Sequence, residues 1–195
     1  MGKTGLIVKA ADIIRRGAIT EVVGRLSSGR TSLVLAALRD TLTRGGVAAL
    51  VDTDGAFDPE SAHAAGIDLR RVLWVRCSGR RDVALRATDL LVRCPGFALV
   101  VLDVGESPPF VSLATAFRLR LAVRRADTAL VILASRHIVG ASAALVVETI
   151  ARGPEWAGMG DTPRRLAGAR SDVWMRRVQG AAPELRAEGW RWRAG

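Results

Sequence analysis

Short apolar runs alternate with amphipathic segments along the first two thirds of the chain. Continuous apolar stretches of strand length occupy 47–51, 72–75, 98–102 and 129–133, and the mostly apolar segment 18–23 is interpreted as a further buried strand. Between them, apolar positions recur every three or four residues, as they do in helices that bury one face. This spacing predicts helices between Arg30 and Gly45 and at 59–65, 83–91 and 110–121. Such alternation predicts an α/β fold, with a mainly parallel sheet flanked by helices on both faces.

The pattern changes after Gly140, where helical spacing stops. Three further strands are expected without helices between them, at 144–150, 172–178 and 185–192. Consecutive strands without intervening helices pair antiparallel, so antiparallel strands should complete the C-terminal edge of the sheet. The segment from Gly153 to Gly168 is rich in glycine and proline and is expected to be an exposed loop. On the preceding helix, one apolar stripe is interpreted as core: Phe110, Leu113, Phe117 and Leu121.

The first sixteen residues form a separate amphipathic pattern. An isolated helix of this length is marginal in water, so it should dock either on the core of its own chain or on a neighbouring subunit of a homo-oligomer. We therefore expect an N-terminal helix at 1–16 and a single domain at 17–195. The candidate partner-surface residues of this helix are Leu6, Ile7, Ile13 and Ile14.

Composition limits the classes of function. The 195 residues suffice for one domain with a sizeable core. No apolar run approaches the roughly 20 residues needed to span a bilayer, and the N-terminus lacks the apolar core of a secretory signal. A cytoplasmic protein without a membrane partner is therefore expected. The two cysteines and two histidines show no metal-ligand spacing, so no metal site is expected from them.

The chain is strongly basic, with a net charge of +10 and a pI near 11.4. Such a charge is typical of proteins that bind nucleic acid. Nearly all of the basic residues are arginine, however, and many are spread along the chain in pairs such as Arg70-Arg71 and Arg124-Arg125. A solvated surface explains this distribution better than a groove that binds DNA. The charge therefore predicts weak or non-specific DNA binding at most.

A glycine-rich loop between the first strand and the next helix carries the most specific chemical signal. It reads Gly24-Arg-Leu-Ser-Ser-Gly-Arg-Thr-Ser, with two glycines at the spacing of a phosphate-binding loop. Glycines let the backbone fold round a phosphate, and the helix N-terminus offers unpaired N–H groups. Arg30 occupies the position of the lysine that reaches the β- and γ-phosphates, and the two cations are not equivalent. The candidate nucleotide-binding residues are Gly24, Ser27, Ser28, Gly29, Arg30, Thr31, Ser32, Asp54 and Asp103, the last as a ligand of Mg²⁺.

Three stretches of the chain resemble the RecA recombinase core in order and spacing. They are the loop with its strand from Gly17, the segment Val51-Asp-Thr-Asp-Gly-Ala-Phe-Asp-Pro, and Gly66-Ile-Asp; Gly180-Ala-Ala-Pro is similar to a later RecA motif. The resemblance covers roughly 17–183 and implies a RecA-like core. It also implies that Asp103 stands at the Walker B aspartate and Asp54 at the catalytic glutamate.

The departures from the RecA pattern fall on the residues that perform hydrolysis. Asp54 is one methylene shorter than the glutamate, Ser61 replaces the tyrosine that stacks on adenine, and Ser135 replaces the glutamine that senses the γ-phosphate. Both DNA-binding loops are shortened. The resemblance therefore implies a non-catalytic protein that binds ATP or ADP with Mg²⁺ weakly if at all. The competing interpretation is a loop retained because Gly24 and Gly29 supply backbone geometry.

Two groups of degenerate RecA-like proteins resemble a chain of this size. ImuA belongs to a damage-induced mutagenesis cassette and works with a Y-family-like polymerase adaptor in translesion synthesis, whereas SulA inhibits cell division and keeps little of the phosphate loop. Because this chain keeps the glycines, Ser27-Ser28 and Thr31, ImuA fits better. The resemblance implies an accessory role in the SOS response, through contacts with the adaptor and with RecA, whose filaments it would inhibit. The alternatives are a SulA-like inhibitor and a weak RecA-paralogue ATPase.

Two indoles near the C-terminus form a second candidate partner surface. If 185–192 is a strand, Trp190 and Trp192 project to the same side. Tryptophan is enriched at binding hot spots, but the same two indoles would also cap the core at the end of the sheet. The sequence leaves both interpretations open.

Overall fold

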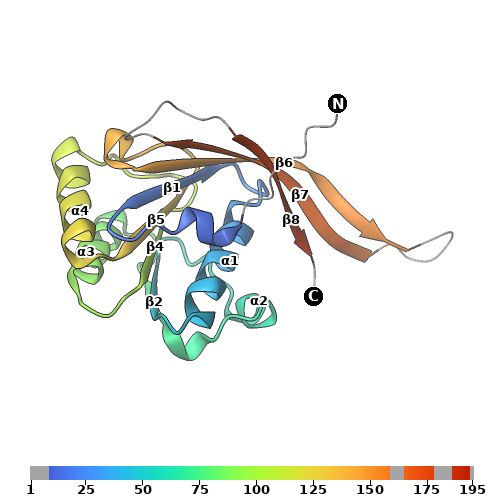
Figure 1. The fold of residues 1–195 in the computed structure, drawn as a ribbon, viewed down its shortest axis with the longest axis horizontal. Helices are drawn as coiled ribbons and strands as arrows, with labels where there is room; N and C mark the ends of the chain where they lie inside the picture. Colours follow the sequence, from blue (N-terminus) through green and yellow to red (C-terminus); the bar gives the residue numbers. More distant parts are fainter. Residues whose placement is uncertain (1–8, 159–164, 178–185, 194–195) are drawn as a thin grey trace.

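The computed structural model of the chain describes residues 9–158, 165–177 and 186–193. They form one eight-stranded sheet in the order β3-β2-β4-β5-β1-β6-β7-β8. The strands are β1 (Ile19–Gly24), β2 (Ala48–Asp52), β3 (Val72–Arg76), β4 (Leu99–Asp103), β5 (Ala129–Ala134), β6 (Leu145–Ala157), β7 (Arg165–Arg177) and β8 (Arg186–Arg193). All pairings from β3 to β6 are parallel, and β7 and β8 add antiparallel strands. The predicted mainly parallel sheet with an antiparallel C-terminal edge is confirmed (Figure 1).

Helices within the described residues cover both faces of the sheet (Figure 1). They are α1 (Arg30–Thr43), α2 (Pro59–Ala64), α3 (Arg81–Arg93) and α4 (Leu113–Ala126). One core, which includes Leu38 and Val131, lies under α1 and α2, and the other, which includes Leu119 and Ile132, lies under α3 and α4. Successive side chains of a strand point alternately into the two cores. Because both faces are buried, most residues of the parallel strands are apolar. None of the described helices has the length and apolar character needed to cross a membrane.

The described part of the N-terminal segment corrects the predicted helix. A short 3-10 helix, η1 (Ala10–Ile13), stands where α-helical turns were expected. Ile13 is fully buried, and Ile14 is partly buried against the core under α1. Because burial of Ile13 within the chain removes it from water, Ile13 is a core residue and not a subunit contact; for Ile14, which keeps some exposure, the subunit contact stays a prediction. Leu6 and Ile7 lie outside the described residues.

The segment predicted as a loop between Gly153 and Gly168 is, where described, part of a long β-hairpin arm. β6 and β7 are thirteen residues long each and project beyond the helical layers (Figure 1). The strand accommodates Gly153 because the pairing register shifts between Ala151 and Gly153, and such a bulge tolerates backbone that a regular ladder does not. Near the end of the described arm, Trp156 lies opposite Leu166, and both are exposed.

The predicted C-terminal strand is present as β8. Trp190 and Trp192 pair with Ser171 and Ala169 of β7 along the backbone. The two indole side chains lie outside the described part of the structure. Their assignment as a partner surface therefore stays a prediction.

The apolar stripe of α4 corrects a further expectation. The stripe interpreted as core is exposed, at Phe110, Leu113, Phe117 and Leu121. A second stripe faces the sheet instead, at Ala116, Leu119, Ala122 and Val123. Its smaller side chains allow a close approach to the strands at the density that protein interiors require.

Candidate functional site

The carboxyl ends of three parallel strands meet at one edge of the sheet. β1 ends at Gly24 and continues into the glycine-rich loop, while β2 and β4 end at Asp52 and Asp103, which are register partners. In open α/β sheets, ligands bind outside the carboxyl ends of the strands. The fold therefore brings together the loop and the acidic residues that the sequence singled out.

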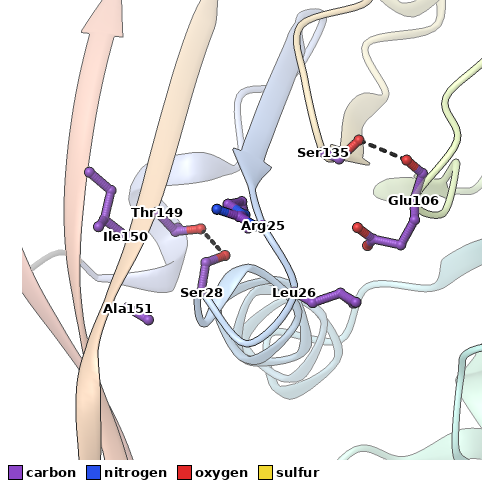
Figure 2. A pocket seen from close by; sticks show the side chains of 8 residues that line it. All are labelled: Arg25, Leu26, Ser28, Glu106, Ser135, Thr149, Ile150 and Ala151. Carbon is purple, nitrogen blue, oxygen red and sulfur yellow. Dashed lines mark hydrogen bonds between the residues drawn. The ribbon is translucent and has the colours of Figure 1, made fainter.

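Close packing fixes the glycine-rich loop. A Cβ atom on Gly24 would collide with the side-chain oxygens of Ser28 and Thr149. These two hydroxyls hydrogen-bond each other at 2.7 Å and tie the loop to β6 (Figure 2). Gly29 caps α1 with a φ of 87°, a conformation that favours glycine. Both glycines are therefore explained by requirements of the fold itself.

A cavity of about 590 Å³ opens beside the loop (Figure 2). Its wall comprises Arg25, Leu26, Ser28, Glu106, Ser135, Thr149, Ile150 and Ala151. The cavity thus lies between the loop, the residue after β5, and β6. It offers space for a small ligand at the edge where the strands end, but Arg30 is not part of its wall.

Arg30 is already paired inside the protein. Its guanidinium donates hydrogen bonds to the carbonyl oxygen of Gly24 and to the carboxylate of Glu106, with which it forms an ion pair. The Arg30 side chain is only 7% exposed, so the pair is shielded from water on the arginine side. Breaking a shielded pair leaves a charge without a partner. An incoming phosphate would have to compete with Glu106 for this cation.

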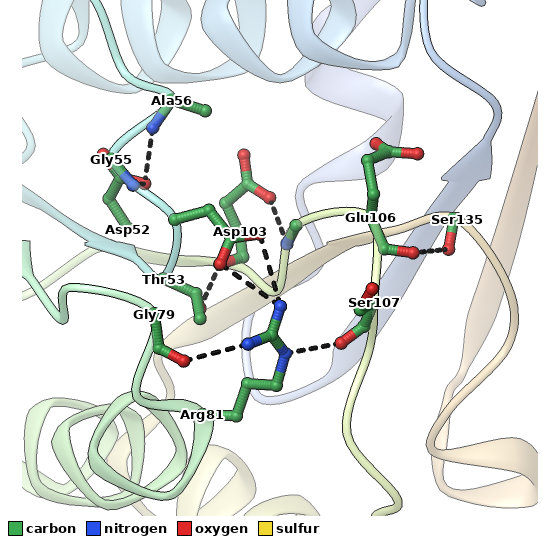
Figure 3. Close-up of polar contacts among 12 residues, drawn as sticks. Asp52, Thr53, Gly55, Ala56, Gly79, Arg81, Asp103, Glu106, Ser107 and Ser135 are labelled. Atoms are coloured by element: carbon green, nitrogen blue, oxygen red, sulfur yellow. Dashed lines mark hydrogen bonds and ion pairs between the residues drawn. The ribbon is translucent and has the colours of Figure 1, made fainter.

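Asp54 is held in a similar way by Arg81 of α3. One guanidinium nitrogen lies 3.3 and 3.4 Å from the two carboxylate oxygens of Asp54. The same guanidinium donates to the carbonyl oxygens of Gly79 and Ser107 (Figure 3). A general base must present an oxygen to the water that it activates. Here both oxygens of Asp54 contact Arg81 instead.

Asp52 is a structural acceptor. It is 1% exposed and accepts hydrogen bonds from the backbone N–H groups of Gly55, Ala56 and Phe57, with the indole N–H of Trp74 as a fourth donor at 3.2 Å. Four donors satisfy a buried carboxylate. The structure therefore supports a role for Asp52 as an acceptor of N–H bonds that holds the turn after β2.

Asp103, at the end of β4, has a pKa that is shifted upward. Burial raises the pKa of Asp103 above its ordinary value, and the nearby charges of Asp52 and Asp54 act in the same direction. The hydrogen bond from the Gly105 N–H and the charge of Arg30 oppose this shift and are outweighed. The protein therefore disfavours the ionised form that a Mg²⁺ ligand requires.

Replacing Asp103 by Asn should stabilise the protein at neutral pH. A carboxyl whose pKa is raised in the folded state costs stability once it ionises, so this cost grows as pH rises above 3.8, the ordinary value, and is complete above the folded pKa. The advantage of Asp103→Asn in Tm should therefore be smallest in acid and largest at neutral pH. Thermal melts across that range test this, with the exposed Asp82→Asn as a control for loss of one charge. An advantage that does not change with pH would contradict it.

The other predicted site residues are placed as follows. Ser28 is buried, Ser32 is half-buried, and Ser27 and Thr31 are exposed. Two residues that hold the site together were not predicted: Glu106, 76 positions from Arg30, and Arg81, 27 positions from Asp54. No motif or periodicity marks either of them. Among the described residues, no group of three or more His, Cys, Asp or Glu side chains is arranged to hold a metal ion.

Comparison with known proteins identifies the family. The family profile described as the RecA N-terminal domain matches residues 7–108, more than half of the chain. This chain belongs to the RecA family. The RecA proteins of Borrelia hermsii and Chlorobaculum parvum are 38% and 41% identical to it over 88 residues, which are 45% of this chain. The same match covers only 24% and 25% of those two proteins, so the chain spans about a quarter of their length.

A solved recombinase shares the whole fold. The crystal structure of the RadB recombinase matches with a TM-score of 0.63 and 20% sequence identity, covering 99% of this chain and 96% of that one. At this identity the likeness bears on the fold alone. It confirms the RecA-like core, including the antiparallel C-terminal edge that lies beyond the segment matched by RecA.

Proposed function

We propose that this RecA-family chain is a non-hydrolysing accessory protein of the DNA-damage response, acting in translesion mutagenesis through protein contacts. The observation that carries the proposal is the pairing of Arg30 with Glu106. In a phosphate-binding loop, the residue at this position supplies the cation for the β- and γ-phosphates. Here that cation is committed to a carboxylate of the same chain.

Nucleotide binding would have to displace this ion pair. Hydrogen bonds to charged groups contribute about 1.5–3 kcal/mol each, and each 1.4 kcal/mol is a tenfold change in affinity. Loss of the contact with Glu106 therefore offsets much of what a phosphate would gain from Arg30. The glycines alone offer backbone N–H groups, which suffice for weak binding of ATP or ADP with Mg²⁺ at most.

Two positions around the loop support the same proposal. Ser61, at the position of the adenine-stacking tyrosine, is exposed and donates its hydroxyl hydrogen bond to Asp58. Ser135, at the position of the γ-phosphate sensor, donates to the backbone carbonyl of Glu106 at 3.0 Å. Neither side chain supplies the aromatic surface or the amide that those roles need.

The choice of partner separates this proposal from its alternatives. An ImuA-like protein would bind a Y-family-like polymerase adaptor, whereas a SulA-like protein would bind the tubulin-like division protein. The retained glycine loop favours the first, because SulA keeps little of it. The purified chain, immobilised and offered both proteins from the same organism, should retain the adaptor; retention of the division protein alone would support the alternative.

We also expect the protein to interfere with RecA. A chain with the RecA-like core but with shortened DNA loops could join a filament end and stop its growth. Added to a RecA strand-exchange reaction, it should lower the yield at ratios well below saturation of the DNA. Binding of labelled single-stranded DNA in the absence of RecA is the control, because competition for DNA would also lower the yield. Undiminished strand exchange at equimolar protein would contradict the expectation.

A further inference from the structure

An apolar ridge runs along the outer side of α4. We define the α4 ridge as four side chains that are 87%, 77%, 51% and 38% exposed: Phe110, Leu113, Phe117 and Leu121. Spacings of four residues keep Leu113, Phe117 and Leu121 on one side of the helix, and Phe110 lies shortly before its first residue. The opposite side of α4 already packs on the sheet. The α4 ridge is therefore not needed by the core of this domain.

The α4 ridge lies apart from the other features that carry function. It is at the end of the molecule opposite the β6–β7 arm (Figure 1), and none of its four residues lines the cavity beside the glycine-rich loop. Large apolar side chains scattered singly over a surface are ordinary, but a continuous row of them marks an interaction site.

Positive charge surrounds the α4 ridge. The helix reads Leu-Ala-Thr-Ala-Phe-Arg-Leu-Arg-Leu-Ala-Val-Arg-Arg-Ala and contains no acidic residue. Its four arginines are Arg118, Arg120, Arg124 and Arg125. Only Arg118 has a nearby carboxylate among the described ion pairs, Asp89 at 3.7 Å. An occupant of this surface must therefore combine an apolar face with negative charge at its rim.

Charge disfavours a second copy of the chain that docks through its own α4. Two α4 ridges placed face to face would bring eight arginines together without an acidic residue on either helix, and like charges across an interface are strongly unfavourable. The N-terminal residues Met1-Gly-Lys-Thr-Gly-Leu-Ile-Val are apolar in part but also lack an acidic residue. Neither arrangement supplies the complementary negative charge, so we assign that charge to a different molecule.

The geometry favours a helix over a nucleic acid. Leu113 and Leu121 are about 12 Å apart along the helix axis, which matches two turns of a partner helix. Nucleic-acid platforms use aromatic rings on which bases stack, whereas two of the four ridge residues are aliphatic and cannot stack. An amphipathic helix instead presents apolar anchors at three- and four-residue spacing.

We propose that the α4 ridge docks an acidic amphipathic helix of another protein. Its apolar anchors contact Leu113, Phe117 and Leu121, and carboxylates on its flanks pair with the arginines of α4. The surface is separate from the glycine-rich loop, so this inference stands or falls independently of whether the chain binds a nucleotide.

A pair of designed peptides tests the proposal. One is a labelled helical peptide of about 18 residues, with a leucine stripe flanked by glutamates; the other has the same stripe flanked by lysines. Fluorescence anisotropy with the full chain should show binding at least about tenfold tighter for the glutamate peptide, weakening as salt is added. Reversing two exposed arginines, Arg124→Glu with Arg125→Glu, should shift the preference toward the lysine peptide.

Matched variants separate the ridge from the rest of the surface. Leu113→Ser with Phe117→Ser should weaken binding of the glutamate peptide at least about tenfold and leave Tm nearly unchanged, because both side chains are exposed. Leu90→Ser, at an α3 residue that is 70% exposed and outside the ridge, should leave binding unchanged. A Tm lower by many degrees in the ridge variant would show that these residues are core and overturn the proposal.

Three other outcomes would also overturn it. Equal affinity for the two peptides would show that charge does not select the occupant. A single-stranded oligonucleotide that binds the full chain and is lost in the ridge variant would show that the ridge is a nucleic-acid surface. A dimer in sedimentation velocity that dissociates in the ridge variant would show that a second copy occupies it.

Discussion

Replacing Arg30 by Lys and Glu106 by Ala in the same chain should raise its affinity for Mg²⁺-ATP about 100-fold. Lysine restores the compact ammonium that a phosphate loop uses, and alanine removes the carboxylate that competes for the cation at this position. Each change alters about one charge-assisted hydrogen bond, worth roughly tenfold in affinity. Isothermal titration calorimetry on the unaltered chain, the two single variants and the double variant measures both contributions.

The control for this experiment is Glu60→Ala combined with Arg30→Lys. Glu60 is exposed on α2 and forms no described ion pair with Arg30, so its removal changes net charge by the same amount without freeing the loop. The control should gain only the effect of the lysine. An unaltered chain that binds as tightly as the double variant would show that the Arg30–Glu106 pair does not restrain the site.

Neither the unaltered chain nor that double variant should hydrolyse ATP, with or without single-stranded DNA. Arg81 holds both oxygens of Asp54, and this carboxylate is one methylene shorter than the glutamate whose position it takes. Loss of a general base costs about 10²- to 10⁴-fold in rate, and misplacement of a reacting group costs about 10²-fold. A coupled assay should therefore record no more activity than in the matching chains that carry Asp103→Ala.

The double variant separates binding from chemistry. Tight binding without turnover would locate the defect in the hydrolysis step rather than in the glycine-rich loop. Several turnovers per minute in the unaltered chain, abolished by Asp103→Ala, would instead identify a working RecA-paralogue ATPase. That result would contradict the non-hydrolysing role and leave the family assignment intact.

The parallel strands and the loop could be predicted from the sequence because their signals are local. A strand buried on both faces, such as Leu99–Asp103, is a continuous apolar run, and its polar last residue marks where the run ends. Gly24 and Gly29 mark the loop at fixed spacing. These features depend on neighbours in sequence, so the pattern of residues suffices to place them.

Other features could not be predicted because the local sequence is compatible with two structures, and contacts with distant parts of the chain decide between them. α4 carries two stripes, one through Phe117 and one through Leu119, and periodicity alone does not say which one faces the sheet. The arm around Gly153 is a strand because a partner strand runs alongside it, although its composition is that of a loop. The partners of Arg30 and Asp54 come from distant segments that no motif connects.

The collision that a side chain at position 24 would have with Ser28 and Thr149 does not depend on any bound nucleotide. A lineage that stopped using ATP would therefore still be selected to keep Gly24. A larger residue at this position would break the packing of the loop against β6. Position 30 is restrained in a different way, by the shielded ion pair of Arg30 with Glu106. In chains of this kind, Gly24 and Gly29 indicate descent from a nucleotide-binding fold, whereas the residue at position 30 and its partner Glu106 indicate whether the loop can still bind a phosphate.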